Sequence, residues 1–180
     1  LRGDGRDEAV GAGGEGARLR ALTRQIAGDE RPKQFCRLLG HQTLLAETRQ
    51  RVGLSVNPQR ILYVVSRHHE RFYRSELDSV PAARLIEQPV GRGTTIAITY
   101  ALARLSTMDR QPLVGIFPAD HHYAQSDACR RAVGAACRAA EAGPARGYLI
   151  GTRPGHPETG SSLPRPGRRP RRDLHPPDGR

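Results

Sequence analysis

The chain has 180 residues, a length that suits one domain, or one domain with a tail. Hydrophobic residues make up 37% of it, aromatic residues only 4%, and tryptophan is absent, so any core must rest on aliphatic side chains. The formal net charge of +11 suggests a nucleic-acid partner. However, the arginines are scattered, without a dense stripe and without interleaved aromatic residues for base stacking, which argues against a nucleic-acid binder.

Strands and helices are predicted to alternate along the chain. The first predicted strand ends at Ala9 and Val10, and a glycine-dense turn follows it. The other predicted strands are residues 60–66, 84–89, 113–117 and 146–154. Helices are predicted within residues 42–56, 68–77, 91–106 and 127–143. This alternation predicts an α/β fold, a Rossmann-like, mostly parallel sheet with helices on both faces. Ligands bind such sheets beyond the carboxyl ends of the strands.

Residues 161–180 differ from the rest of the chain. Five of these 20 residues are proline, and the only large apolar side chains are Leu163 and Leu174. The segment cannot bury enough apolar surface to become ordered. We therefore expect one domain over residues 9–160 and a disordered Arg/Pro-rich tail over residues 161–180.

The cysteines and the apolar runs indicate the compartment. Cys36, Cys129 and Cys137 form no CxxC pair, and the last two lie too far apart along a predicted helix to bridge. We expect buried free thiols in a reducing compartment. No apolar run approaches the length of a membrane span, and no signal-peptide hydrophobic region is seen, so we expect a cytoplasmic protein without a membrane partner.

Three segments contain residues suited to phosphate or metal chemistry. Residues 12–18 are glycine-rich, which lets backbone N–H groups approach a phosphate, although they match no standard phosphate-loop motif and a plain turn is the alternative. Lys33, the only lysine in the chain, follows Pro32; the alternative is a surface lysine. Asp120 follows a predicted strand and could hold Mg²⁺. The adjacent His121 and His122 should point apart, which argues against zinc.

The segments AGGEGARL, RPKQF, EQPVGRGTTIAI, FPADH and PETG occur in this order. Together they resemble the mannose-1-phosphate guanylyltransferases (GDP-mannose pyrophosphorylases) of the sugar nucleotidyltransferase family. The resemblance runs from about Ala9 to Gly160 and covers only the N-terminal part of the family pattern. It implies transfer of a guanylyl group from GTP to mannose 1-phosphate, giving GDP-mannose and pyrophosphate, with Mg²⁺ as the cofactor.

The resemblance also implies a role for particular residues. Arg18 and Lys33 would be catalytic, with Arg18 near the triphosphate and Lys33 facing the α-phosphate, where charge develops. Asp120 would hold Mg²⁺, and Glu158 and Thr159 would meet the sugar hydroxyls. The nucleotide-binding residues would be Ala12, Gly13, Gly14, Gly16, Gln88, Gly91 and Thr94.

The sequence departs from the family pattern in two places that bear on activity. GRGT replaces the usual GRNT, which would alter contacts with the base. After Gly160 the family continues to a second lysine, for the sugar phosphate, and a second metal-binding aspartate, which have no counterpart in residues 161–180. We therefore expect little or no turnover from this chain; the alternative is a non-catalytic nucleotide-binding remnant.

The abrupt change in composition at Gly160 leads to a further hypothesis. Arg, Pro, Gly and Ala are encoded by GC-rich codons in any frame, so both ends of the chain could be out-of-frame sequence around an authentic core. Reading the coding DNA in its other two frames, in search of a family-like continuation, tests this hypothesis.

Overall fold

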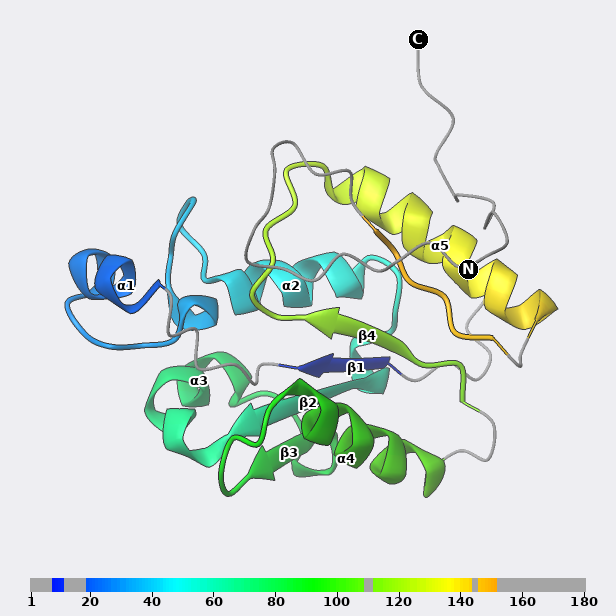
Figure 1. Cartoon of the computed structure of the whole chain (residues 1–180), viewed down its shortest axis with the longest axis horizontal. Helices are drawn as coiled ribbons and strands as arrows, with labels where there is room; N and C mark the ends of the chain where they lie inside the picture. Colours follow the sequence, from blue (N-terminus) through cyan, green and yellow to red (C-terminus); the bar gives the residue numbers. More distant parts are fainter. Residues whose placement is uncertain (1–7, 12–18, 109–111, 144–145, 152–180) are drawn as a thin grey trace, which may run out of the picture. The chain divides into compact units, whose positions relative to one another are not determined.

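Four parallel strands form the centre of the first of two compact units, Leu1–Ser126 and Asp127–Arg180. The computed structural model describes residues 8–11, 19–108, 112–143 and 146–151. The strands are β1 (Glu8–Gly11), β2 (Ile61–Ser66), β3 (Leu85–Gln88) and β4 (Gly115–Pro118). They lie side by side in the order β3-β2-β1-β4 (Figure 1). This order places β1 and β4, which are distant in sequence, next to each other.

The pairing register aligns the carboxyl ends of the strands. Gly11 pairs with Val64 of β2 and with Pro118 of β4, and Ser66 pairs with Gln88 of β3. Since all pairs are parallel, the loops that follow the four strands leave the sheet at the same edge. This is the edge at which ligands bind in open α/β sheets.

Helices cover both faces of this sheet. Strand β2 is buried along its whole length, and its side chains alternate between two apolar clusters. Ile61, Tyr63 and Val65 pack with residues of α2 (Leu44–Gly53) and α3 (Glu70–Leu77), whereas Leu62 and Val64 pack with α4 (Thr94–Ser106). The continuous apolar run of β2 is therefore explained by burial on both faces. The predicted α/β arrangement with a parallel sheet is confirmed.

The ends of the helices follow from local chemistry. Thr43 caps α2, because its Oγ1 accepts a hydrogen bond from Ala46 N at 3.1 Å. Gly28 ends α1 (Arg20–Ala27) with a φ of 75°. Gly93 precedes α4 with φ 83° and ψ 172°, a conformation essentially confined to glycine. The described residues of this unit also form short 3-10 turns: η2 (Lys33–Phe35), η3 (Pro58–Arg60), η4 (Arg67–His69) and η5 (Ala82–Arg84).

The structure differs from the sequence-based expectations in three places. Helix α1 was not predicted; its apolar residues Leu22 and Ile26 have helical spacing but are about half exposed, so they give no burial signal. Strand β4 begins two residues later than expected. The prediction of a strand over residues 146–154 is wrong for residues 146–151, which form none. Leu149 in this segment is 79% exposed. An apolar run becomes a strand only where its backbone groups find a partner for hydrogen bonding.

The second unit contains all of α5 (Ser126–Ala142) except its first residue, Ser126. Asp127 in its first turn pairs with Arg130, Oδ1 to Nε, at 3.4 Å. Of the three cysteines, Cys36 is buried as expected, whereas Cys129 and Cys137 on α5 are only half-buried. Within the described residues, no helix has the length and apolar character needed to cross a membrane.

Candidate functional site

Lys33 is placed by a turn that is anchored in the core of the first unit. It opens η2, and the two following residues, Gln34 and Phe35, are each 2% exposed. The Phe35 ring stacks against that of Phe72 on α3, with 5.9 Å between the ring centroids. Cys36 N donates to the carbonyl of Lys33 at 3.0 Å. The backbone of Lys33 is thus fixed, while its side chain keeps 26% of its surface exposed.

Asp120 lies at the carboxyl end of β4, beside this turn. Its Oδ2 is 2.8 Å from Lys33 Nζ, a distance typical of a charge-assisted hydrogen bond. The preceding residue, Ala119, is buried and belongs to the same core cluster as Phe35. Each partner of the ion pair therefore has a near neighbour in sequence that is buried in this cluster. Lys33 and Asp120 thus lie together in the structure, while their catalytic and metal-binding roles stay predictions.

Helix α2 holds the loop that carries Asp120. Arg51 is 7% exposed, and its Nη2 donates to the carbonyl of His121 at 3.1 Å and to Thr48 Oγ1 at 2.8 Å. The Arg51 guanidinium also lies 4.5 Å from the centroid of the Tyr123 ring. One turn earlier on α2, Glu47 Oε2 is 2.8 Å from His122 Nδ1. The sequence analysis missed Arg51 and Glu47; their spacing indicates a common helix face but cannot identify the loop they contact.

The two histidines after Asp120 have different partners, as expected for adjacent residues. His121 Nε2 is 3.7 Å from Asp120 Oδ1, whereas His122 turns to Glu47. Among the described residues, no group of three or more His, Cys, Asp and Glu side chains could hold a metal ion. Asp120 is the carboxylate that the sequence analysis assigned to Mg²⁺, and that role stays a prediction. One carboxylate suffices where substrate phosphates and water complete the coordination of Mg²⁺.

The other predicted nucleotide-binding residues lie at the carboxyl ends of β2 and β3. Gln88 ends β3, is 6% exposed and pairs in register with Ser66, which is 4% exposed. A Cβ added at Gly91 would lie 4.0 Å from Ser66 Oγ, so the loop passes close to the end of β2. Thr94 is exposed and opens α4. These residues therefore lie at the same carboxyl edge of the sheet as Asp120, with β2 and β1 between β3 and β4.

Seven predicted site residues lie outside the described part of the chain. They are Ala12, Gly13, Gly14, Gly16, Arg18, Glu158 and Thr159. The expected tail, residues 161–180, also lies outside it. For the glycine segment, the described backbone fixes only the entry point. Strand β1 ends at Gly11, which pairs with Pro118 of β4. Asp120 follows Pro118 by two residues.

Charged residues just before Lys33 stiffen the approach to the turn. Arg31 binds Asp29 with two parallel hydrogen bonds, Nε to Oδ1 at 2.8 Å and Nη2 to Oδ2 at 2.9 Å. The hydrogen bonds from Arg31 hold the pKa of Asp29 below its ordinary value. Burial raises the pKa of the Cys36 thiol, which directly follows η2. Cys36 is thus an unreactive packing residue rather than a nucleophile.

A small parallel sheet, helices on both faces and polar residues at the carboxyl ends of its strands define an α/β domain of the nucleotide-binding type. Comparison with known proteins agrees with this class. The nucleotidyl transferase family model matches residues 10–160. This chain therefore belongs to the nucleotidyl transferase family.

The relatives include enzymes that act on mannose 1-phosphate by name. The chain is 32% identical over 154 residues to a mannose-1-phosphate guanylyltransferase of Escherichia coli, and 32% identical over 151 residues to the alginate biosynthesis protein AlgA of Pseudomonas aeruginosa. These alignments cover 83% of this chain but only 31% and 30% of the two relatives. The chain thus spans about a third of the length of these relatives.

Solved structures show the same similarity. The crystal structure of a mannose-1-phosphate geranyltransferase from Thermus thermophilus matches with a TM-score of 0.64 and 33% identity, over 78% of this chain and 39% of that one. A mannose-6-phosphate isomerase from Helicobacter pylori matches with a TM-score of 0.57 over 78% of this chain and 48% of that one, at 19% identity, which shows the fold alone.

Proposed function

We propose that this chain is the nucleotide-binding part of a guanylyltransferase that makes GDP-mannose and pyrophosphate from GTP and mannose 1-phosphate. The observation that carries the proposal is the ion pair of Lys33 and Asp120, 2.8 Å between Nζ and Oδ2, at the carboxyl edge of a parallel sheet. Family membership and the relatives' names support the substrate class. The proposal extends to catalysis only as far as the part of the family pattern that is present.

The proposed chemistry needs fixed charge and positioning rather than a covalent nucleophile. A phosphate oxygen of mannose 1-phosphate attacks the α-phosphorus of GTP, and the bond to the departing pyrophosphate breaks. Lys33 would stabilise the negative charge that develops on the α-phosphoryl oxygens, and Arg18 would do so for the pyrophosphate. The core-anchored η2 turn keeps the backbone of Lys33 in place. Gln88, Gly91 and Thr94 would line the base pocket, and Glu158 and Thr159 would meet the sugar.

Asp120 would hold the Mg²⁺ that the family typically uses. The chemistry that Mg²⁺ supplies is neutralisation of phosphate oxygens. In a magnesium nucleotide, the Mg²⁺ ion would take the place of Lys33 beside Asp120, and a phosphate would take the place of Asp120 beside Lys33. The Arg51 clamp on the carbonyl of His121 would keep the carboxylate at a constant distance from the turn.

The second candidate function is nucleotide binding without turnover. It rests on the same ion pair, because the Lys33–Asp120 pair offers groups for a magnesium nucleotide whether or not transfer follows. The two candidates share the nucleotide site and differ only in the transfer step, so one set of proteins can separate them.

The test measures GTP binding and pyrophosphate release with Mg²⁺ and mannose 1-phosphate. Lys33→Ala should weaken GTP binding at least tenfold, and Lys33→Arg should restore it only in part, because a planar guanidinium cannot take the place of a compact ammonium. Arg104→Ala, which removes an exposed charge from α4, is the matched control. Release that depends on Lys33 supports transfer, and Lys33-dependent binding without release supports the second candidate. Equal binding by the Lys33→Ala variant overturns both.

A further inference from the structure

Helix α2 supports both segments that carry the Lys33–Asp120 ion pair. It contacts η2, which begins at Lys33, and β4, which ends two residues before Asp120. Leu45 of α2 belongs to the core cluster that also contains Phe35 of η2 and Ala119 of the loop after β4. One helix thus packs beside the turn of the cation and beside the loop of the carboxylate.

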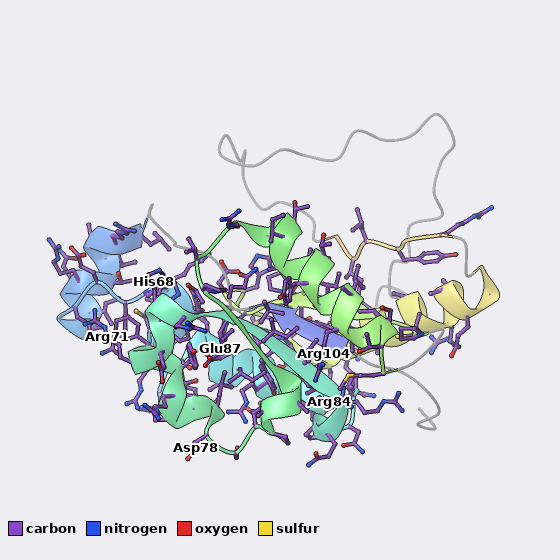
Figure 2. The ribbon with its side chains drawn as sticks, turned by 90° about the horizontal axis from the view of Figure 1, so that it is seen from below. His68, Arg71, Asp78, Arg84, Glu87 and Arg104 are labelled. Carbon is purple, nitrogen blue, oxygen red and sulfur yellow. The ribbon has the colours of Figure 1, made fainter. Side chains whose placement is uncertain are left out.

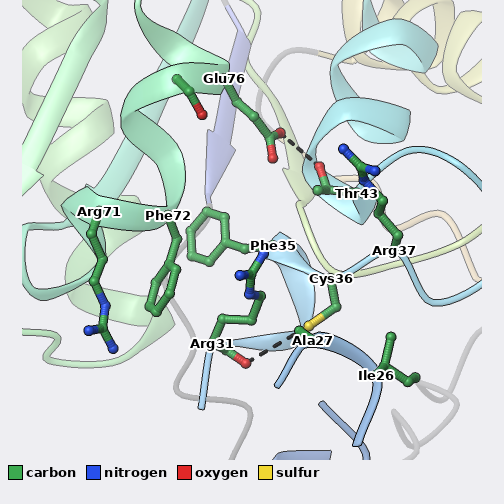
Figure 3. A pocket seen from close by; sticks show the side chains of 11 residues that line it. Ile26, Ala27, Arg31, Phe35, Cys36, Arg37, Thr43, Arg71, Phe72 and Glu76 are labelled. Atoms are coloured by element: carbon green, nitrogen blue, oxygen red, sulfur yellow. Dashed lines mark hydrogen bonds between the residues drawn. The ribbon is translucent and has the colours of Figure 1, made fainter. Parts of the chain in front are cut away.

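Helix α2 is itself anchored to α3. Thr43, the residue that caps α2, donates from Oγ1 to Glu76 Oε2 at 2.7 Å, the hydrogen bond drawn between these side chains in Figure 3. Arg49 of α2 also donates to the backbone carbonyl of Glu76. Because the two bonds start from different turns of α2, they hold this helix to α3 at two points along its length.

The polar face of α2 holds the loop after β4 at three consecutive residues. Arg51 donates to the carbonyl of His121 and lies against the Tyr123 ring. Between these two contacts, Glu47 Oε2 lies 2.8 Å from His122 Nδ1, a distance at which the ring can donate a hydrogen bond. The Glu47 side chain is only 19% exposed, so salt screens this contact less than it screens a pair on the open surface.

We propose that Glu47 is a positioning residue of the nucleotide site: through His122 it sets the orientation of the loop after β4, and so the place at which Asp120 meets the Mg²⁺ of a bound nucleotide. This inference rests on the proposed function, which assigns Asp120 to Mg²⁺. Mg²⁺ demands near-ideal octahedral geometry with ligands at about 2.0–2.1 Å, so a carboxylate that shares it with phosphate oxygens must be held in place. The contact of Glu47 with His122, two residues after Asp120, supplies that restraint.

A purely local role for Glu47 makes a different prediction. Glu47 lies in the first turn of α2, where a negative charge also stabilises the helix through its dipole. Glu47→Gln separates the two roles, because the amide loses the charge but keeps an oxygen that can accept a hydrogen bond from His122. A positioning role therefore survives in Glu47→Gln and is lost in Glu47→Ala, whereas a dipole role is lost in both.

The test measures the affinity of the full chain for GTP by titration calorimetry, once with Mg²⁺ and once with EDTA. Glu47→Ala should weaken binding of the magnesium nucleotide about tenfold, the size of effect seen when a group behind a metal ligand is lost. It should leave the affinity in EDTA within about twofold, because Lys33 is unchanged. Glu47→Gln should restore most of the loss. A merely structural effect lowers both affinities alike.

Hydrogen exchange without nucleotide gives a second measurement. In Glu47→Ala the amides of residues 120–124 should exchange about threefold faster, through the lost contact with the loop, while those of residues 33–35 should be unchanged. Glu70→Ala is the matched control. Glu70 also lies in the first turn of its helix, α3, and pairs there with Arg74, so its removal should alter neither the exchange of residues 120–124 nor the affinity for GTP.

The outcomes separate this inference from the proposed function. Unchanged exchange at residues 120–124 and unchanged affinity for the magnesium nucleotide in Glu47→Ala overturn the positioning role and leave the proposed function standing. Equal losses with Mg²⁺ and with EDTA, or no recovery in Glu47→Gln, overturn the positioning role as well. Wild-type GTP binding that depends on neither Mg²⁺ nor Lys33 overturns the proposed function instead, and the positioning role toward Mg²⁺ falls with it.

Discussion

The fold alters the titration of Tyr73 on α3. This residue is 2% exposed, and its hydroxyl donates to Glu87 Oε1 on β3 at 2.8 Å; Figure 2 labels Glu87 on this strand. Burial, reinforced by this bond to a carboxylate, raises the pKa of Tyr73 well above its ordinary value of about 10. The folded protein therefore keeps a proton that the unfolded chain loses.

The pH dependence of stability follows from this shift. Above about pH 10 the unfolded chain ionises Tyr73 and the folded chain does not, so the free energy of unfolding falls as the pH rises through that range. Tyr73→Phe should cost about 1 kcal/mol at neutral pH, through the lost hydrogen bond, and should flatten the alkaline decline. Urea unfolding at pH 7 to 11 measures both. Tyr100→Phe, at a position 62% exposed, should change neither quantity; an alkaline decline unaltered in Tyr73→Phe would contradict this assignment.

Among the elements, the contact between α2 and the loop after β4 gives a prediction about stability. Arg51→Lys keeps the charge but loses the fork that reaches both Thr48 and the carbonyl of His121. We expect a loss of about 1 to 2 kcal/mol in the free energy of unfolding. Hydrogen exchange at the amides of residues 120–124 should become faster. Arg74→Lys, at a surface pair 81% exposed at the arginine, should change stability by less than about 0.5 kcal/mol. Equal losses in both variants would refute the clamp.

The entry to α4 depends on the backbone of Gly93. At φ 83° and ψ 172° a side chain is strained, although a Cβ there would meet no atom within 4 Å. Gly93→Ala should therefore cost about 1 to 3 kcal/mol through conformation alone. Gly91→Ala is the control, because Gly91 lacks a positive φ and its added Cβ would make only an ordinary contact with Ser66. Thermal unfolding of both variants measures the difference; a smaller loss for Gly93→Ala than for Gly91→Ala would contradict it.

The elements also show how far the sequence could be interpreted. The apolar run of β2 and the helical spacing of α2 were predicted correctly, because burial on one or both faces leaves a periodic pattern. Helix α1 was missed because Leu22 and Ile26 remain about half exposed. The strand expected at residues 146–154 failed for its first six residues because strand pairing is a tertiary property that composition does not encode.

At the scale of the whole molecule, stability rests on a core with two sides, one on each face of the sheet. Leu105 on α4 is fully buried in the cluster with Leu62 and Val64. Leu105→Ala should lower the free energy of unfolding by about 2 to 5 kcal/mol, a large part of what a domain of this size possesses. Leu54→Ala, at a position 57% exposed, should change it by less than about 0.5 kcal/mol. Chemical denaturation compares them, and similar midpoints would contradict the proposed core.

The candidate site was only partly accessible to sequence reasoning. Lys33 and Asp120 were identified from a resemblance, and the parallel topology explains why residues so distant in sequence meet at one edge. The Arg51 clamp could not be foreseen, because it depends on how α2 packs against the loop after β4. A side chain that binds a distant segment leaves no periodic pattern in the sequence around it.

The Lys33–Asp120 ion pair has a practical consequence, because Lys33 is the only lysine in the chain. Any lysine-selective acylating reagent has a single side-chain target, separable from the terminal amine by peptide mapping. Its rate of modification becomes a direct measure of how tightly the ammonium is held. Asp120→Asn should accelerate acylation of Lys33, and a bound nucleotide should slow it. The arginine-rich composition thus turns one salt bridge into a reporter for the whole edge of the sheet.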